Sequence, residues 1–161
     1  MIEELGKVDK ALFSKLYEQL QKINIRRLSS NATRLGFGKQ RICQFGKVRP
    51  RFKPGIHLSA CSIKHQDIYE ELKSIGDAMC PFPFTSINVN HNVTCPPHKD
   101  KNNKGKSMLV SFGEYSGCNI VIDGKTYDTN CNPIVFDGSK QEHYNTDDLS
   151  GNKYSLVYYS I

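Results

Sequence analysis

The stretch that decides the fold is residues 84–100, FTSINVNHNVTCPPHKD, because it joins a strand to two side chains that can bind a metal. Phe84–Asn90 is a short strand-like run rich in β-forming residues. His98 and Asp100 stand two positions apart at the edge of that strand, where alternate side chains point to the same side. These two side chains can therefore bind one metal ion together.

A third ligand is needed to complete such a site. Two imidazoles and one carboxylate on a single face of an octahedron leave three positions open, as oxygen activation at non-haem Fe(II) requires. Among the other four histidines, only His143 follows a predicted strand and a turn and precedes a final strand. His143 is therefore the candidate third ligand. A bare His-x-Asp pair occurs by chance in many chains, so the evidence lies in what surrounds it.

Short strands follow one another after residue 84, whereas helices come before it. Strand-like runs occur at 108–112, 119–122, 133–136 and 154–159, with Asp-Gly turns at 123–124 and 137–138. Helical spacing of apolar residues predicts a helix from Asp9 to about Lys22, lying against a sheet, and another from about His65 to Ala78. This order predicts an α+β domain whose core is a barrel or jelly roll.

The bulk properties suit one globular domain. The chain has 161 residues, of which 38% are hydrophobic. No apolar run approaches the roughly 20 residues that cross a bilayer, and the start, MIEELGKVDK, lacks the apolar core of a secretory signal. We therefore expect an intracellular protein with no membrane partner and no obligate protein partner. The six cysteines form no CxxC pair, which predicts free, mostly buried thiols.

Residues 26–53 supply the whole positive excess of the chain. They contain nine basic and no acidic residues, whereas the rest carries 13 basic and 16 acidic ones. We interpret the segment as an irregular arm or lid for a polyanionic partner such as nucleic acid. Its aromatic residues, among them Phe45 and Phe52, would support the arm or stack on an extruded base. The alternative is an ordinary solvated loop. The candidate substrate contacts are Arg34, Lys39, Arg41, Arg49 and Asn102.

An ordered set of motifs surrounds the metal pair. Residues 87–90 (INVN), 98–102 (HKDKN), 110–120 (VSFGEYSGCNI), His143 and 153–157 (KYSLV) follow in that order. Together they resemble the Fe(II)/2-oxoglutarate-dependent oxygenases over about residues 84–161. Within these the sequence is most similar to the TET/JBP group, which oxidises the 5-methyl group of pyrimidines in nucleic acid. The resemblance implies a single oxygenase domain over 1–161, with a helical and basic part to about residue 80. A double-stranded β-helix core, jelly-roll and cupin-like, would follow from about 84 to 161.

The resemblance also implies roles for individual residues. His98, Asp100 and His143 would bind Fe(II), with 2-oxoglutarate and O₂ as co-substrates. Lys153, ten residues after His143, would anchor the distal carboxylate of 2-oxoglutarate, which needs a counter-charge inside the barrel. Asn88 would hydrogen-bond the co-substrate, as an Asn does in AlkB-type enzymes. Asn90, on the same face, stands where those enzymes have a Tyr.

Two departures from the family pattern bear on the substrate and on a turn. The anchor is more often Arg than Lys, and a lysine is a point charge rather than a bidentate fork; the related prolyl hydroxylases do use Lys. Cys118 stands where the family often has a second Gly after Gly117.

The sequence thus predicts a dioxygenase that hydroxylates the 5-methyl group of 5-methylcytosine or thymine in nucleic acid and releases succinate and CO₂. A base in a duplex would first be flipped out. The alternatives are a prolyl-type protein hydroxylase with the same cofactors, favoured by Lys153 and the short chain, and a metal-free barrel that only binds nucleic acid.

Overall fold

The computed structural model describes residues 2–23, 25, 41–50 and 52–161. In chain order the elements are β1 Glu3–Glu4, a 3-10 helix η1 Lys10–Phe13, α1 Ser14–Gln21, β2 Arg41–Val48, β3 His57–Leu58, α3 Ala60–Lys64, α4 Gln66–Met79, β4 Ser86–His91, β5 Ser107–Ser116, β6 Ile120–Ile122, β7 Lys125–Tyr127, β8 Ile134–Phe136, β9 His143–Asn145 and β10 Ser150–Tyr159.

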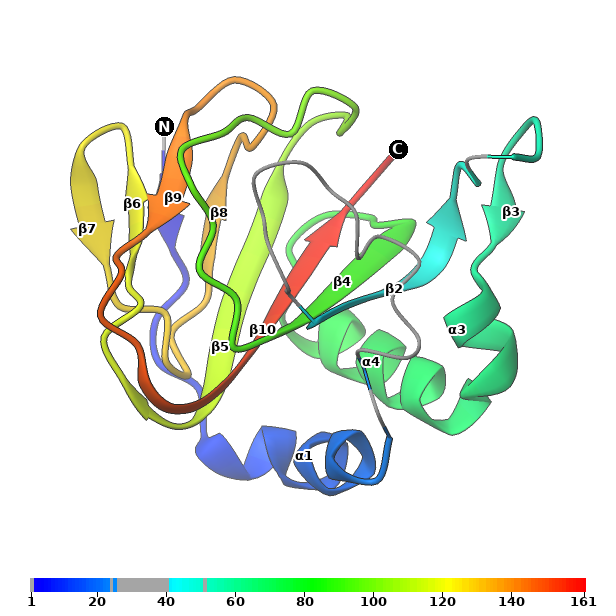
Figure 1. Cartoon of the computed structure of the whole chain (residues 1–161), viewed down its shortest axis with the longest axis horizontal. Coiled ribbons are helices and arrows are strands. Elements are labelled where there is room, and N and C mark those ends of the chain that lie inside the picture. Colours follow the sequence, from blue (N-terminus) through cyan, green and yellow to red (C-terminus); the bar gives the residue numbers. More distant parts are fainter. Residues whose placement is uncertain (1, 24, 26–40, 51) are drawn as a thin grey trace.

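Within the described residues the strands form two antiparallel sheets. The large sheet has the order β1-β8-β5-β10-β4-β2-β3, and the small sheet has the order β7-β6-β9. Figure 1 shows the small sheet at one side of the molecule and helices α1 and α4 beneath the large sheet. The predicted α+β architecture with a jelly-roll core is therefore confirmed.

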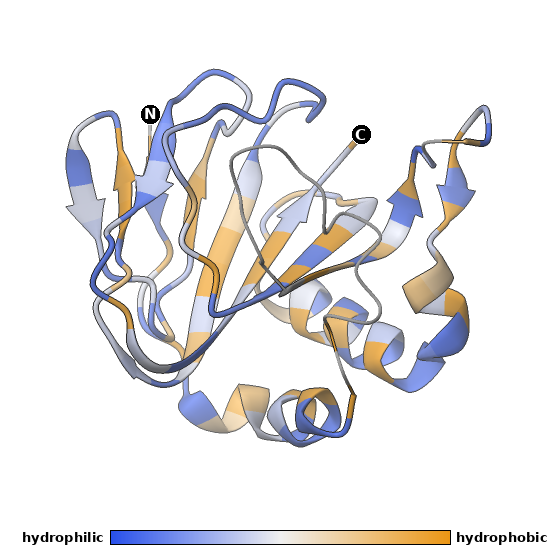
Figure 2. Ribbon diagram, viewed as in Figure 1, coloured by the Kyte–Doolittle hydropathy of each residue, from blue (hydrophilic) through white to orange (hydrophobic). Residues whose placement is uncertain are grey.

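The helices cover one face of the large sheet. Leu16 and Leu20 of α1 and Leu72 of α4 are buried in one core cluster with Val110 of β5 and Leu156 of β10. Both predicted helices are confirmed, and the Asp9 side chain caps η1 by accepting a hydrogen bond from the Ala11 N–H. In Figure 2 the strands of the large sheet alternate between hydrophobic and hydrophilic residues along their length. The apolar face lies on the helices, and the more polar face is left for a site.

A second core cluster lies between the two sheets. It joins Leu109 of β5 and Phe136 of β8 to Ile120 and Ile122 of β6. The predicted Asp123-Gly124 turn links β6 to β7, and both residues have positive φ, 49° and 84°, as a tight hairpin turn requires. The apolar cluster packs the small sheet against the large sheet.

Part of the basic segment differs from the prediction of an irregular arm. Residues 41–48 form strand β2, which pairs along β4 with Phe45 opposite Ile87. Phe45 is fully buried, so its predicted stacking on an extruded base is wrong. Pairing with β4 and burial of Cys43 and Phe45 outweigh the basic character of the segment, and the Lys47 side chain is exposed. Gly46 permits the close approach: a Cβ there would lie 2.4 Å from the Thr85 carbonyl oxygen.

Three of the predicted substrate contacts in the basic segment cannot be compared with the structure. Arg34 and Lys39 lie outside the described residues, and for Arg41 only the backbone is described. Among the described residues, no helix has both the length and the apolar character needed to cross a membrane.

Candidate metal centre and pocket

Three predicted metal ligands converge in space although the chain separates them. His98 and Asp100 lie in the loop after β4, and His143 opens β9; one ligand atom from each lies within 4.8 Å of the others. The Asp100 carboxylate is 3.2 Å from His143 Nε2 and 3.6 Å from His98 Nε2. The two imidazole centroids are 4.2 Å apart. This spacing is compact enough for one ion to touch all three.

Backbone hydrogen bonds bring the loop to the strand. The N–H of His98 donates to the His143 carbonyl and the N–H of His143 to the His98 carbonyl, both at 3.0 Å. The Asp100 N–H donates to the Gly138 carbonyl at 2.7 Å. A Cβ at position 138 would lie 3.0 Å from Asp100 Oδ2, so the glycine leaves room for the carboxylate. Main-chain hydrogen bonds thus position the loop that carries His98 and Asp100 beside His143.

The other ring nitrogen of each histidine is already engaged. His98 Nδ1 lies 2.7 Å from the Pro96 carbonyl oxygen, and His143 Nδ1 lies 2.8 Å from the Gln141 carbonyl oxygen. Because a carbonyl oxygen only accepts, each Nδ1 carries the proton and donates it. The Nε2 lone pairs of both rings then face the Asp100 carboxylate. Such a backbone contact fixes the tautomer and ring orientation of metal-binding histidines, so the donor set fits a divalent cation such as Fe(II).

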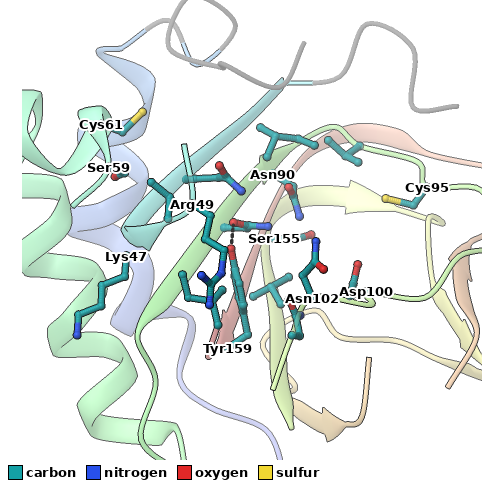
Figure 3. A pocket seen from close by; sticks show the side chains of 18 of the residues that line it. Lys47, Arg49, Ser59, Cys61, Asn90, Cys95, Asp100, Asn102, Ser155 and Tyr159 are labelled. Carbon is teal, nitrogen blue, oxygen red and sulfur yellow. Dashed lines mark hydrogen bonds between the residues drawn. The ribbon is translucent and has the colours of Figure 1, made fainter. Parts of the chain in front are cut away.

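The triad lines a pocket of about 1020 Å³ between the two sheets. The pocket wall also includes five of the other predicted site residues: Asn88, Asn90, Lys153, Arg49 and Asn102. Figure 3 shows Asn90, Asn102, Asp100 and Arg49 around this space. Arg49 and Asn102 are exposed at the rim, where they can meet a substrate. Lysines 47, 53 and 101 also line the pocket, whereas Asp100 is the one acidic side chain among its described lining residues.

Lys153 is a buried cation in the wall of this pocket. It is only 3% exposed, and its Nζ donates to the Cys118 carbonyl at 2.6 Å. The Tyr115 ring centroid is 5.4 Å away, and burial raises the pKa of that phenol, so Tyr115 stays neutral. Among the described residues, no carboxylate forms an ion pair with Lys153. Since a buried charge is normally paired, the lysine fits an anionic ligand.

Cys118 takes the backbone conformation that a glycine would take. Its φ is 51°, in the left-handed region, and its N–H donates to Asp148 Oδ1 at 2.7 Å. Gly117 before it has φ 70°, and a Cβ there would lie 2.1 Å from the Asp148 carbonyl oxygen. The tight turn therefore persists despite the cysteine, and it aims the Cys118 carbonyl at Lys153.

The polar face of the large sheet adds Tyr159, which the sequence interpretation missed, to the predicted Asn88 and Asn90. Asn88 and Asn90 of β4 lie opposite Val157 and Ser155 of β10. The Tyr159 hydroxyl donates to Asn88 Oδ1 at 2.9 Å, the contact dashed in Figure 3. Tyr159 thus brings a phenol beside the asparagine from a different strand. The alternation 153, 155, 157, 159 of the terminal strand could have revealed it, because those side chains share a face with Lys153.

No family model matches the sequence, and no curated protein matches it significantly. Solved structures do match the fold. The structure of NgTET1 in complex with 5mC DNA matches with a TM-score of 0.67 and 14% identity, over 99% of this chain and 71% of that one. OsALKBH1 matches with a TM-score of 0.60 and 10% identity, over 99% and 96%. A Pseudomonas putida prolyl-4-hydroxylase matches with a TM-score of 0.56 and 10% identity, over 98% and 91%.

These matches concern the fold, and they agree with the fold class predicted from the motifs. The chain has the double-stranded β-helix fold of these structures, and its pocket contains a cluster of two histidines and one aspartate. The TET/JBP group is not singled out, since the identities to all three structures are only 10–14%.

Proposed function

We propose that the protein is an Fe(II)/2-oxoglutarate-dependent dioxygenase. The observation that carries the proposal is the convergence of His98, Asp100 and His143 in the pocket that also contains the buried Lys153. When bound, Fe(II) and 2-oxoglutarate supply the oxidant that converts a substrate C–H to C–OH with O₂, releasing succinate and CO₂. The main chain and side chains of this protein position the groups that react.

The residues around the centre divide the work of positioning. The Pro96 and Gln141 carbonyls hold both imidazoles with Nε2 toward the metal position. Lys153 neutralises the distal carboxylate of 2-oxoglutarate, because no acidic group among the described residues already pairs with it. Tyr159 orients the Asn88 amide toward the co-substrate, and Asn90 lies on the same face. Together these contacts would hold the co-substrate in one orientation.

The favoured substrate is a 5-methylpyrimidine in nucleic acid, 5-methylcytosine or thymine, with DNA favoured over RNA. The rim supports this choice: Arg49 and the exposed lysines at positions 47, 53 and 101 are suited to phosphates. The pocket is large enough for the co-substrate and a flipped base together. The structural match to a protein solved with 5mC DNA points the same way. A nucleic-acid substrate also fits the intracellular location expected from the sequence. Arg34, Lys39, Arg41 and Asn102 remain proposed contacts.

The second candidate function is prolyl-type hydroxylation of a protein. The lysine anchor and the fold shared with a prolyl-4-hydroxylase favour it. Both candidate functions use the same proposed iron site and differ only in the substrate that enters the pocket. A barrel that binds nucleic acid without catalysis is the third candidate.

Turnover on defined substrates tests these proposals together. The purified protein with Fe(II), 2-oxoglutarate and O₂ is offered 5-methylcytosine and thymine oligonucleotides, single- and double-stranded DNA and RNA, and proline-rich peptides. We expect succinate release together with a 16 Da gain on a methylated oligonucleotide. A gain on peptide alone would overturn the nucleobase proposal.

Variants separate catalysis from binding in the same assay. His98→Ala is expected to abolish succinate release, whereas His91→Ala, a histidine stacked on Tyr154 and outside the pocket lining, keeps it. Oligonucleotide binding without succinate, unchanged in His98→Ala, would favour the non-catalytic barrel.

A further inference from the structure

Two cysteines outside the metal centre lie in unusually close contact. Cys43 is in β2 and Cys61 is in α3, 18 positions later, and their sulfur atoms are 2.6 Å apart. Non-bonded heavy atoms normally stay about 3.5–4.0 Å apart, whereas a disulfide bond measures about 2.05 Å. The two residues are not joined by a disulfide bond. Two thiols held this close need little movement to become covalently joined.

The surrounding backbone holds the pair together. The Ser59 N–H donates to the Gly46 carbonyl at 2.8 Å, and the Gly46 N–H donates to the Ser62 hydroxyl at 2.7 Å. These two hydrogen bonds fasten the start of α3 to β2 on either side of Cys61. They hold the backbones of Cys43 and Cys61 close to each other, so the short distance between the two sulfurs needs no movement of β2 or α3.

The two thiols are not equivalent. Cys43 is 1% exposed, whereas Cys61 is 7% exposed and lines the pocket, as Figure 3 shows. The Cys43 thiol donates a hydrogen bond to the Cys61 sulfur, which lowers the pKa of Cys61 against the opposing effect of burial. The Gln44 N–H and the Lys64 charge act in the same direction. Cys61 is therefore the nucleophile of the pair, since the thiolate is the reactive form.

We propose that Cys43 and Cys61 form a site of reversible disulfide formation that fastens α3 to β2 at the wall of the pocket. With a peroxide as oxidant, the Cys61 thiolate takes one oxygen, giving a sulfenic acid and releasing water. The Cys43 thiol then attacks that sulfur, the S–S bond forms, and a second water leaves. Two thiols lose two electrons and two protons, and the peroxide is reduced to two waters. The site does not depend on the proposed iron chemistry.

The disulfide would restrain a segment that forms part of the pocket rim. The segment between the two cysteines carries Lys47, Arg49 and Lys53, all of which line the pocket. A disulfide would close this segment into a covalent loop and limit its unfolding. For a loop of this length the expected rise in Tm is about 5–10 °C.

Thiol mapping tests the proposal on the intact chain. Reduced protein is treated with hydrogen peroxide at one equivalent, denatured, alkylated and examined by intact mass and non-reducing peptide mapping. We expect four alkylated cysteines instead of six, a peptide linking Cys43 to Cys61, reversal by dithiothreitol, and the rise in Tm. Six alkylated cysteines, a different linked pair, or an unchanged Tm would overturn the proposal.

Variants provide the matched controls. Cys43→Ser is expected to lose the linked peptide and the rise in Tm, whereas Cys131→Ser, a cysteine outside the pair, keeps both. If Cys43→Ser does not fold, the peptide map of the unsubstituted protein still decides. Retention of the oxidation-induced rise in Tm by a folded Cys43→Ser variant would contradict the assignment.

Discussion

Lys153 is the residue that most directly indicates an anionic ligand in the pocket. Its side chain is buried and donates to a backbone carbonyl, so a bound carboxylate would supply the missing counter-charge. Its Nζ is held by the Cys118 carbonyl, so the charge is oriented before any ligand arrives. A lysine in this position recognises a carboxylate by charge rather than by a bidentate fork. Lys153 thus supports 2-oxoglutarate as the co-substrate. It does not indicate the class of substrate, which depends on the residues at the rim of the pocket.

Replacing Lys153 with methionine tests this assignment. The Kd for 2-oxoglutarate should rise roughly 100-fold, or about 3 kcal/mol, because a buried charge pair is lost. The Tm of the ligand-free protein should not fall, since methionine keeps the volume and removes a desolvated charge. Lys153→Arg should retain part of the affinity. Calorimetric titration and thermal denaturation measure both quantities; an unchanged Kd in the methionine variant would refute the anchor role.

The contribution of Asp148 to the stability of the fold is expected to depend on pH. Hydrogen bonds from the Thr146 hydroxyl and the Cys118 N–H lower the pKa of its carboxyl below 3.8. Since the folded pKa is lowered, the stabilisation is present above the unfolded value and is lost as pH falls through the folded value. Asp148→Ala should therefore be less stable than the unsubstituted protein at pH 6, and the difference should shrink below pH 3.8. Denaturation at several pH values checks this; a gap independent of pH would count against it.

Among the elements, the length and pairing of strand β2 are what the sequence interpretation missed. The glycines and prolines of the basic segment predicted loops and short strands in an irregular arm, yet burial of Cys43 and Phe45 and pairing with β4 make residues 41–48 a strand of the large sheet. Helices α1 and α4 were predictable because apolar spacing alone determines which face is buried. Pairing between distant segments leaves no such local signal, so the place of β2 beside β4 needed the structure. The alternation of the terminal strand indicates the face on which Tyr159 lies, but not its hydrogen bond to Asn88.

Two glycine substitutions test whether β2 belongs to the sheet. Gly46 and Gly105 have similar φ, 79° and 75°, but a Cβ would strike the Thr85 carbonyl at the first and meet nothing within 4 Å at the second. Gly105→Ala should cost about 1 kcal/mol from backbone conformation alone. Gly46→Ala should cost about 3 kcal/mol or more, because the strand must also shift. Denaturant unfolding compares them; equal costs would mean that β2 is not tightly paired.

In the whole molecule, the convergence of the candidate metal ligands could be predicted from the sequence, whereas the substrate could not. The sequence interpretation placed His98 and Asp100 at the edge of a strand, whereas the structure has them in the loop after β4, and it brings one ligand atom of each within 4.8 Å of His143. The substrate depends on the rim, where Arg34 and Lys39 lie outside the described residues and Arg49 is exposed. Exposed charges are placed by loops rather than by the core, so patterns in the sequence indicate their sign but not their geometry.

The most direct test of the central claim is anaerobic titration of Fe(II) into the protein with 2-oxoglutarate, followed by visible absorption. We expect a weak charge-transfer band that saturates at one iron per chain, is absent in His98→Ala and Asp100→Asn, and persists in His91→Ala. No band in the folded, unsubstituted protein, or a band unaffected by His98→Ala, would contradict the account.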